Sequence, residues 1–184
     1  MYEPYITDFT MNIHNKIYKN YVDNLGELKD YKNIVKNIDM FPINERDNIL
    51  FNLGGVLNHE LFFSILGKGE ISESFKNKII EDFGSFDKFK DEFIKSANYV
   101  VGSGYTFLIL NKENKLEIIN TSNEDTPYSY DVYPIMNLDL WEHAYFLDYQ
   151  NNKQEYINNF FSIVDFSKVS KIYEEIQENL QFKN

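Results

Sequence analysis

The sequence contains no cysteine, which excludes a disulfide framework, a thiolate-bound zinc and a cysteine nucleophile. It has no run of about 18 apolar residues, so no membrane-spanning helix is expected. The N-terminal segment MYEPYITDF is acidic and lacks the basic and apolar regions of a secretory signal peptide. From these absences we expect, by default, a cytoplasmic protein.

Basic residues are also scarce, because 18 Lys and Arg face 29 Asp and Glu, which gives a formal net charge of −11. Nucleic acid requires a basic protein face, and an anionic membrane surface attracts basic residues in the same way, so neither partner is expected. The simplest consequence of the charge is solubility. Hydrophobic residues make up 43% of the chain and aromatic residues 17%, which is enough for a folded core.

The first part of the chain, residues 1–69, is predicted to be helical. Apolar residues recur at helical spacing over residues 10–28, with Gly26 near the end, and a second long apolar helix is predicted over residues 48–66. Gly54 and Gly55 lie inside this second helix, where each glycine costs about 1 kcal/mol relative to alanine. We therefore expect a close packing contact at these two glycines.

The second part, residues 70–184, mixes helices and strands. Two short helices are predicted over residues 72–84 and 85–100, and Ser85 is a suitable N-cap for the second. The segments YTFLILN and KLEIINT, joined by a turn, indicate a hairpin, and DVYPIMNLDLW carries a third strand. Helical patterning returns from residue 153. Helices followed by an antiparallel sheet with further helices predict an α+β fold.

The chain has only three histidines, His14, His59 and His143, and all lie in apolar segments. A single histidine is usually an ordinary core or surface residue, but an unpaired buried imidazole costs free energy. One shared metal ion would satisfy all three, with Asp139, four residues before His143, as the anionic ligand. Three imidazoles and one carboxylate suit iron, manganese or zinc, whereas calcium and magnesium require more oxygen ligands.

Several motifs resemble one family. The segment DLWEHAYFLDY resembles the D-V-W-E-H-A-Y-Y-x-D-Y signature of the iron/manganese superoxide dismutases. NHELFF resembles the family's N-H-x-x-F-W, and EPYITDFTMNIH matches E-P-Y-I-x-x-x-T-M-x-I-H without a gap. The resemblance spans nearly the whole chain. It implies an N-terminal helical hairpin (1–69), an α/β domain with a three-stranded antiparallel sheet (70–184), and a homodimer.

The resemblance also implies roles for individual residues. The ligands of one manganese or iron ion per subunit would be His14, His59, Asp139 and His143. Superoxide would be the substrate, with Trp141 as a wall of the pocket. Glu142 matches the family's glutamate that reaches across the dimer to the partner's metal ligand.

The first helix departs from the family pattern. The family spaces its ligand and gateway tyrosine by eight residues, whereas His14 and Tyr21 are seven apart. At roughly 100° per residue, seven steps return to the same helix face, whereas a spacing of eight could realign through a π-bulge. We therefore expect that this chain has lost a bulge and that Tyr21 still faces the metal. The same shortening removes the gateway histidine, whose space Tyr18 or Ile17 could fill, and Phe146 replaces the tyrosine that pairs with it.

The metal's surroundings are altered as well. NEDTP resembles the manganese-type N-Q-D-x-P, but Glu124 replaces the glutamine that hydrogen-bonds the metal's solvent ligand. Gly55 occupies the place of the iron-type glutamine, so the chain follows the manganese type. An ionised Glu124 would accept hydrogen bonds without donating them and would favour the higher metal charge; alternatively, Glu124 is a solvated loop residue. Three positions where tryptophan is usual carry Tyr105, Phe107 and Phe63.

Three functions are compatible with these observations. The first is a superoxide dismutase that produces dioxygen and hydrogen peroxide. The second is a metal-binding homologue with weak or no dismutase activity and a structural or interaction role, which the altered gateway and Glu124 would suit. The third is a different non-haem metal oxidoreductase that uses the same ligands.

Overall fold

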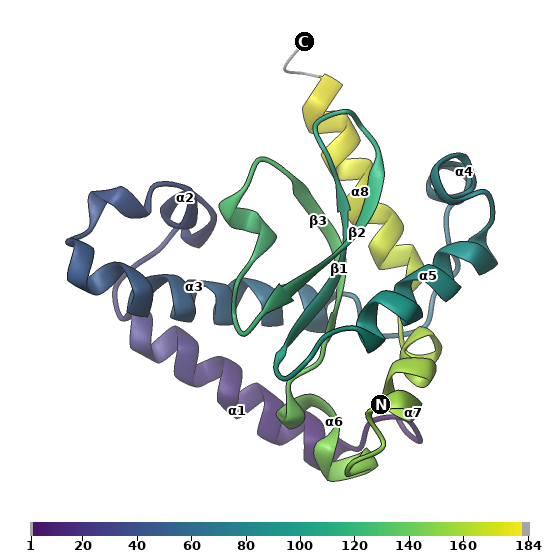
Figure 1. Cartoon of the computed structure of the whole chain (residues 1–184). Helices are drawn as coiled ribbons and strands as arrows, with labels where there is room; N and C mark the ends of the chain where they lie inside the picture. Colours follow the sequence, from purple (N-terminus) through teal and green to yellow (C-terminus); the bar gives the residue numbers. More distant parts are fainter. Residues whose placement is uncertain (1, 182–184) are drawn as a thin grey trace.

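The computed structural model describes residues 2–181, so residue 1 and residues 182–184, the outer ends of the two predicted domains, lie outside the described residues. Two long helices, α1 (Asp8–Leu25) and α3 (Ile43–Ser64), form a hairpin along one side of a small sheet (Figure 1). The Thr7 side chain caps the start of α1, and Gly26 ends it at a φ of 58°, a backbone conformation that favours glycine. The expected N-terminal helical hairpin is thus confirmed.

Two short elements that the periodicity did not predict connect the long helices: α2 (Tyr31–Lys36) and the 3₁₀ helix η1 (Ile38–Met40). Ile34 and Val35 of α2 are buried in a small core with Leu53, Val56 and Leu57 of α3. A helix of six residues is too short to be stable through its own propensity. Its formation therefore depends on this packing.

A three-stranded antiparallel sheet forms the centre of the second part. Its order is β2 (Leu116–Ser122), β1 (Gly104–Leu110) and β3 (Tyr133–Asp139), so the predicted hairpin and third strand are confirmed. Every residue of β1 is buried, as expected for a central strand covered on both faces.

The remaining helices surround this sheet (Figure 1). They are α4 (Glu73–Phe83), α5 (Phe86–Asn98), η2 (Pro127–Ser129), α6 (Glu142–Tyr149), α7 (Lys153–Asn159), η3 (Phe160–Ser162) and α8 (Phe166–Gln181). Ser85 caps α5 as predicted, since its side chain accepts a hydrogen bond from the Lys88 amide. The fold is α+β. Within residues 2–181, no helix combines the length and the apolar character that crossing a bilayer requires.

The main core lies between the sheet and these helices and is rich in aromatic side chains. Its largest fully buried members are Tyr105, Tyr156, Phe62, Phe75, Phe89, Phe93, Phe107 and Phe160. Two backbone hydrogen bonds join the end of the hairpin to this domain, from Gly67 N to Ile163 O and from Asp165 N to Ile65 O, both 2.8 Å. The hairpin is thereby fixed against the sheet, with the site between them.

Candidate metal centre

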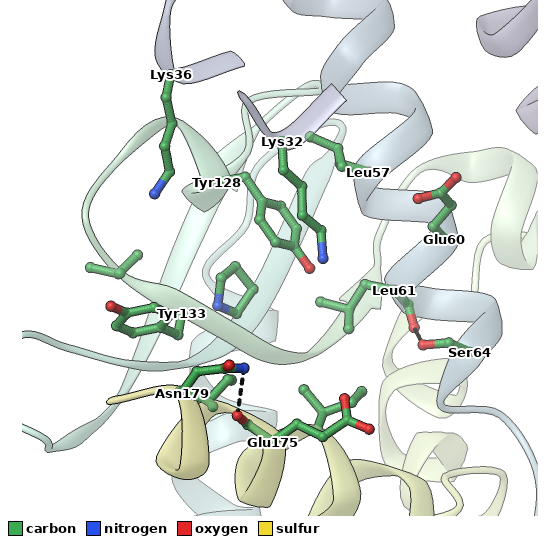
Figure 2. Close-up of a pocket in the computed structure, with 14 residues that line it drawn as sticks. Lys32, Lys36, Leu57, Glu60, Leu61, Ser64, Tyr128, Tyr133, Glu175 and Asn179 are labelled. Carbon is green, nitrogen blue, oxygen red and sulfur yellow. Dashed lines mark hydrogen bonds between the residues drawn. The ribbon is translucent and has the colours of Figure 1, made fainter. Parts of the chain in front are cut away.

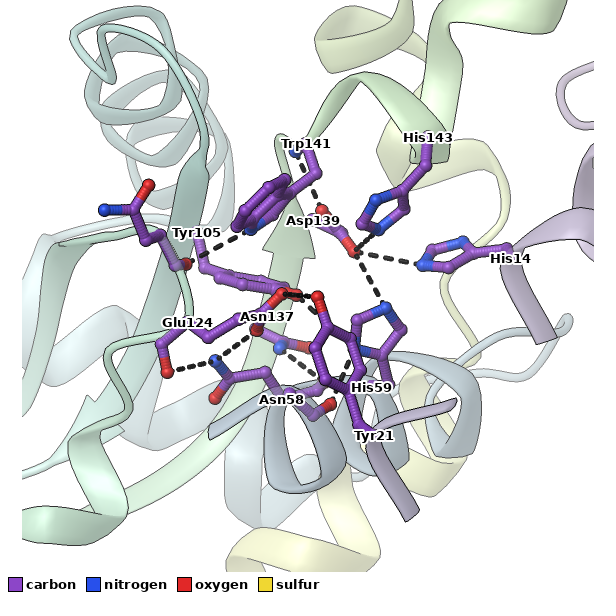
Figure 3. Close-up of polar contacts among 12 residues, drawn as sticks. His14, Tyr21, Asn58, His59, Tyr105, Glu124, Asn137, Asp139, Trp141 and His143 are labelled. Atoms are coloured by element: carbon purple, nitrogen blue, oxygen red, sulfur yellow. Dashed lines mark hydrogen bonds and ion pairs between the residues drawn. The ribbon is translucent and has the colours of Figure 1, made fainter. Parts of the chain in front are cut away.

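Four elements bring the three histidines and Asp139 to one point (Figure 3). His14 comes from α1, His59 from α3, Asp139 from the end of β3 and His143 from the first turn of α6. The Asp139 Oδ2 atom lies 3.0 Å from His14 Nε2, 3.2 Å from His143 Nε2 and 3.7 Å from His59 Nε2. One nitrogen or oxygen of each residue lies within 4.8 Å of the others, which is a spacing that could hold a metal ion.

The chain around Asp139 directs one carboxylate oxygen toward the imidazoles. The Trp141 amide donates a 2.8 Å hydrogen bond to Asp139 Oδ1, which leaves Oδ2 facing the histidines. The buried Tyr156 hydroxyl donates to the Asp139 carbonyl at 2.9 Å. Because α6 begins at Glu142, His143 is its second residue and lies four positions after the carboxylate that it faces.

A second set of bonds fixes α1 against α6. The Thr7 amide and hydroxyl donate to the two carboxylate oxygens of Asp148, at 2.9 and 2.8 Å. Thr7 directly precedes α1, which carries His14, and Asp148 lies on α6, which carries His143. The two residues are 141 positions apart, and neither was identified by sequence reasoning.

The protonation states of the cluster suit a cation. His59 Nδ1 lies 2.6 Å from the Gly55 carbonyl, which can only accept, so Nδ1 carries the proton and Nε2 keeps its lone pair. Burial lowers the pKa of His59 to about 4 and also lowers the pKa of His14. Burial alone would raise the pKa of Asp139, but the imidazoles of His143 and His14 outweigh it and hold that pKa well below its usual range.

The result is an anionic Asp139 carboxylate beside three imidazoles, a donor set that suits iron, manganese or zinc. Among residues 2–181, His59 Nε2 is buried without any hydrogen-bond partner. A buried nitrogen of this kind costs free energy unless something pairs with its lone pair. A metal ion bound by the four side chains would remove that cost, so the residues present fit the metal.

Glu124 and Tyr21 meet beside the cluster (Figure 3). The hydroxyls of Tyr21 and Tyr105 both donate to Glu124 Oε1, at 3.1 and 3.2 Å, and the Asn58 amide donates to Oε2 at 3.3 Å. Glu124 is 1% exposed, so it is not a solvated loop residue. The Tyr21 ring lies 5.4 Å from the His59 ring, and α1 is a continuous α-helix, as expected from the spacing of seven residues.

The Glu124 carboxyl group keeps its proton up to an unusually high pH. Burial and the charge of Asp139 raise its pKa to about 8, against the opposing effect of hydrogen bonds from Tyr105, Tyr21 and Asn58. Burial, together with the neighbouring acidic groups, also raises the pKa of both tyrosines, so both hydroxyls keep their protons. This carboxyl group can therefore carry a proton at neutral pH.

Tyr18 and Trp141 lie at the edges of the cluster. The Tyr18 hydroxyl donates to Glu60 at 3.2 Å, and its ring lies 6.3 Å from His59 and 6.0 Å from Phe63. Trp141 stacks on His143, with ring centroids 5.6 Å apart. Glu60 was not identified from the sequence, although it directly follows a predicted ligand. On α6, Glu142 and Phe146 are both exposed in the single chain.

The contact expected at the two glycines is confirmed. A β-carbon on Gly54 would overlap the Glu124 carbonyl oxygen, and one on Gly55 would lie 2.5 Å from Tyr21 Cγ. Both glycines thus allow α3 to approach the residues that surround the candidate metal ligands.

We expect alanine to have different effects on stability at these two positions. The methyl group added by Gly54→Ala would overlap the Glu124 backbone. This overpacking should lower the free energy of unfolding by more than about 2 kcal/mol. Gly55→Ala meets the Tyr21 ring at Cγ, Cδ1 and Cδ2 and not backbone, so the whole ring must shift; stability should fall by less than for Gly54→Ala, and the Tyr21–Glu124 hydrogen bond should be lost. Urea unfolding measures the first effect and the phenol titration of Tyr21 the second. Equal stability losses for the two variants would contradict this assignment.

Two family descriptions match the chain, one over each of its two parts. The family description of the alpha-hairpin domain of iron/manganese superoxide dismutases matches residues 1–67. The description of the C-terminal domain of the same enzymes matches residues 71–172. The two matches together include all four residues of the cluster.

Proposed function

Because the chain belongs to the iron/manganese superoxide dismutases, we propose that it converts superoxide to dioxygen and hydrogen peroxide at one iron or manganese ion per subunit. The main support is the convergence of three imidazole nitrogens on Asp139 Oδ2, with His59 Nε2 buried and unpaired. We assign His14, His59, Asp139 and His143 as the ligands. A metal ion held by these four side chains would supply the one-electron redox chemistry that the reaction needs.

The reaction of two superoxide ions consumes two protons, so the site must also supply protons. Tyr21 and Glu124 are our candidates, because their hydrogen bond places a phenol and a protonatable carboxyl beside His59. Tyr21 is half-buried while Glu124 is fully buried, so Tyr21 can connect the carboxyl group to solvent. Trp141 and Tyr18 would limit access to the ligands by the positions of their rings.

We further propose a homodimer that forms through α6. Glu142 lies one residue before His143 and is exposed in the single chain, and the neighbouring Phe146 and Leu147 are 46% and 48% exposed. Exposed aromatic side chains such as Phe146 are enriched at subunit interfaces. Sedimentation at micromolar concentration should show a dimer, and Phe146→Glu should shift it to monomer; a monomeric wild-type chain would refute this proposal.

The function is tested by metal analysis beside a superoxide-consumption assay. The full chain is loaded separately with iron and with manganese, and each form is assayed at matched metal content. One metal per subunit with rapid turnover in at least one form supports the proposal. One metal per subunit with negligible turnover in both forms refutes it.

That second outcome would favour a metal-binding homologue with weak or no dismutase activity. Two features of the site support this alternative. Glu124, when ionised, has no proton to donate where the family's amide donates, and the Tyr18 hydroxyl is engaged by Glu60 within its own chain. In that case the folded, metal-loaded protein would serve a structural or interaction role.

A further inference from the structure

A cavity of about 500 Å³ lies between α2, α3, β3 and α8 (Figure 2). On α3 it is lined by Leu57 and Leu61, each two residues from His59. At roughly 100° per residue, two steps reach the opposite face of a helix. The cavity and the candidate metal ligands therefore lie on different sides of α3, and the cavity's volume is within the range of small-molecule sites.

The floor of this cavity is apolar and belongs to packed elements. Leu57 and Leu61 lie one turn apart on α3, Ile172 and Ile176 lie one turn apart on α8, and Pro134 of β3 lies between the two helices. Leu57 and Leu61 are only 2% and 5% exposed. Because helices and a strand form these walls, the cavity is a fixed part of the fold and can accommodate an apolar ligand body.

One end of the cavity presents two hydrogen-bond donors. The Lys32 Nζ atom lies 5.0 Å from the centroid of the Tyr128 ring, and Figure 2 shows the Lys32 ammonium and the Tyr128 hydroxyl both pointing into the cavity. Across residues 2–181, no carboxylate lies within ion-pairing distance of Lys32, and the Tyr128 hydroxyl forms no hydrogen bond. Burial raises the pKa of Tyr128, so its hydroxyl stays protonated.

We propose that this cavity binds a small carboxylate with an apolar body. The carboxylate would lie between Lys32 and Tyr128, and the apolar body would cover Leu57 and Leu61. Glu60 and Glu175 also line the cavity, and Glu60 is close enough for its charge to act on Tyr128, so a negative ligand group is expected on the Lys32 side of the pair. The net charge of −11 disfavours a large polyanion.

The test uses calorimetric titration of the full chain, with its metal content unaltered, by phenylbutyrate, phenylbutanol and phenylbutylamine. These probes share one apolar body and differ in the polar end. Phenylbutyrate should bind most tightly. Lys32→Met keeps the apolar stem and removes the charge. It should therefore lower the affinity for phenylbutyrate by about tenfold or more and leave the affinity for phenylbutanol unchanged.

Lys19→Met is the matched control, because Lys19 is an exposed lysine on α1 that does not line the cavity. It should leave all three affinities unchanged. Tyr128→Phe should lower the affinity for phenylbutyrate by a smaller factor than Lys32→Met does, since it removes one neutral hydrogen-bond donor. The proposal is overturned if phenylbutyrate does not bind at millimolar concentration, if the alcohol or amine binds equally well, or if Lys19→Met has the same effect as Lys32→Met.

Discussion

Replacement of His59 with alanine is expected to abolish stoichiometric metal binding and, with it, superoxide consumption. His59 contributes a lone pair on a buried Nε2 that has no other partner among residues 2–181. Loss of residues that merely orient metal ligands usually costs 10–100-fold in affinity, so loss of a ligand should cost more than about 100-fold. Metal content per subunit, measured after dialysis, checks this directly.

Thermal unfolding provides a second measurement. Ligands that bind only the folded state stabilise it by mass action, so added metal should raise the Tm of the wild-type chain and leave that of His59→Ala unchanged. Without metal, the variant should lose less stability than an ordinary large-to-small core substitution, because it also removes an unpaired buried nitrogen. Retention of one metal per subunit by His59→Ala would contradict the ligand assignment.

Leu53→Ala is the matched control for this experiment. Leu53 is fully buried on the same helix but packs in the small core of the hairpin, away from the four candidate ligands. Its truncation should lower stability by about 2–5 kcal/mol while full metal content is retained. The pair of variants separates metal loss through a missing ligand from metal loss through general destabilisation.

The features predicted correctly from the sequence are those encoded by local pattern. The hairpin helices follow from apolar periodicity, and the strands follow from short β-branched and aromatic runs between turns. The convergence of His14, His59, Asp139 and His143 was expected because these are the chain's three histidines and the carboxylate of one specific motif. The close contact at Gly54 and Gly55 was expected because two glycines inside an apolar helix cost stability without such a contact.

The features missed by sequence reasoning depend on how distant segments cross. Helix α2 forms because Ile34 and Val35 pack on α3, which local propensity does not reveal. The Tyr18–Glu60 bond depends on the register between α1 and α3. The Thr7–Asp148 pair joins the residue before α1 to α6 across 141 positions. The Lys32 and Tyr128 pair in the cavity likewise joins α2 to η2.

Glu124→Gln should remove a pH dependence of stability that the metal-free wild-type chain shows. The Glu124 carboxyl group has a pKa of about 8 in the folded chain, chiefly because of burial, and an ordinary value near 4.5 when exposed. Between these values the folded chain holds a proton that the unfolded chain has released. Stability therefore falls as the pH rises through this window, by on the order of a few kcal/mol. The contribution is fully present below pH 4.5 and is lost above about 8.

Urea unfolding of the metal-free proteins between pH 5 and pH 8.5 measures this effect. Other groups titrate in the same range, including the histidines, so the informative quantity is the difference between wild type and Glu124→Gln. That difference should shift steadily in favour of the glutamine variant as the pH rises. Glu113→Gln, an exposed position in the β1–β2 turn, should track wild type, and parallel curves for wild type and Glu124→Gln would contradict a buried, proton-holding carboxyl group.

The same substitution distinguishes two roles for Glu124 in the metal-loaded protein. A nearby cation lowers the pKa of a carboxyl group, so Glu124 should lose its proton at a lower pH in the loaded chain than in the metal-free chain. If the carboxyl supplies a proton, wild-type turnover should decline with rising pH over that lower range, because the ionised form can only accept hydrogen bonds. Glutamine keeps its N–H donors at every pH, so its turnover should be flat there. A wild-type profile as flat as that of the variant would assign Glu124 to positioning Tyr21 and Tyr105, without a part in proton supply.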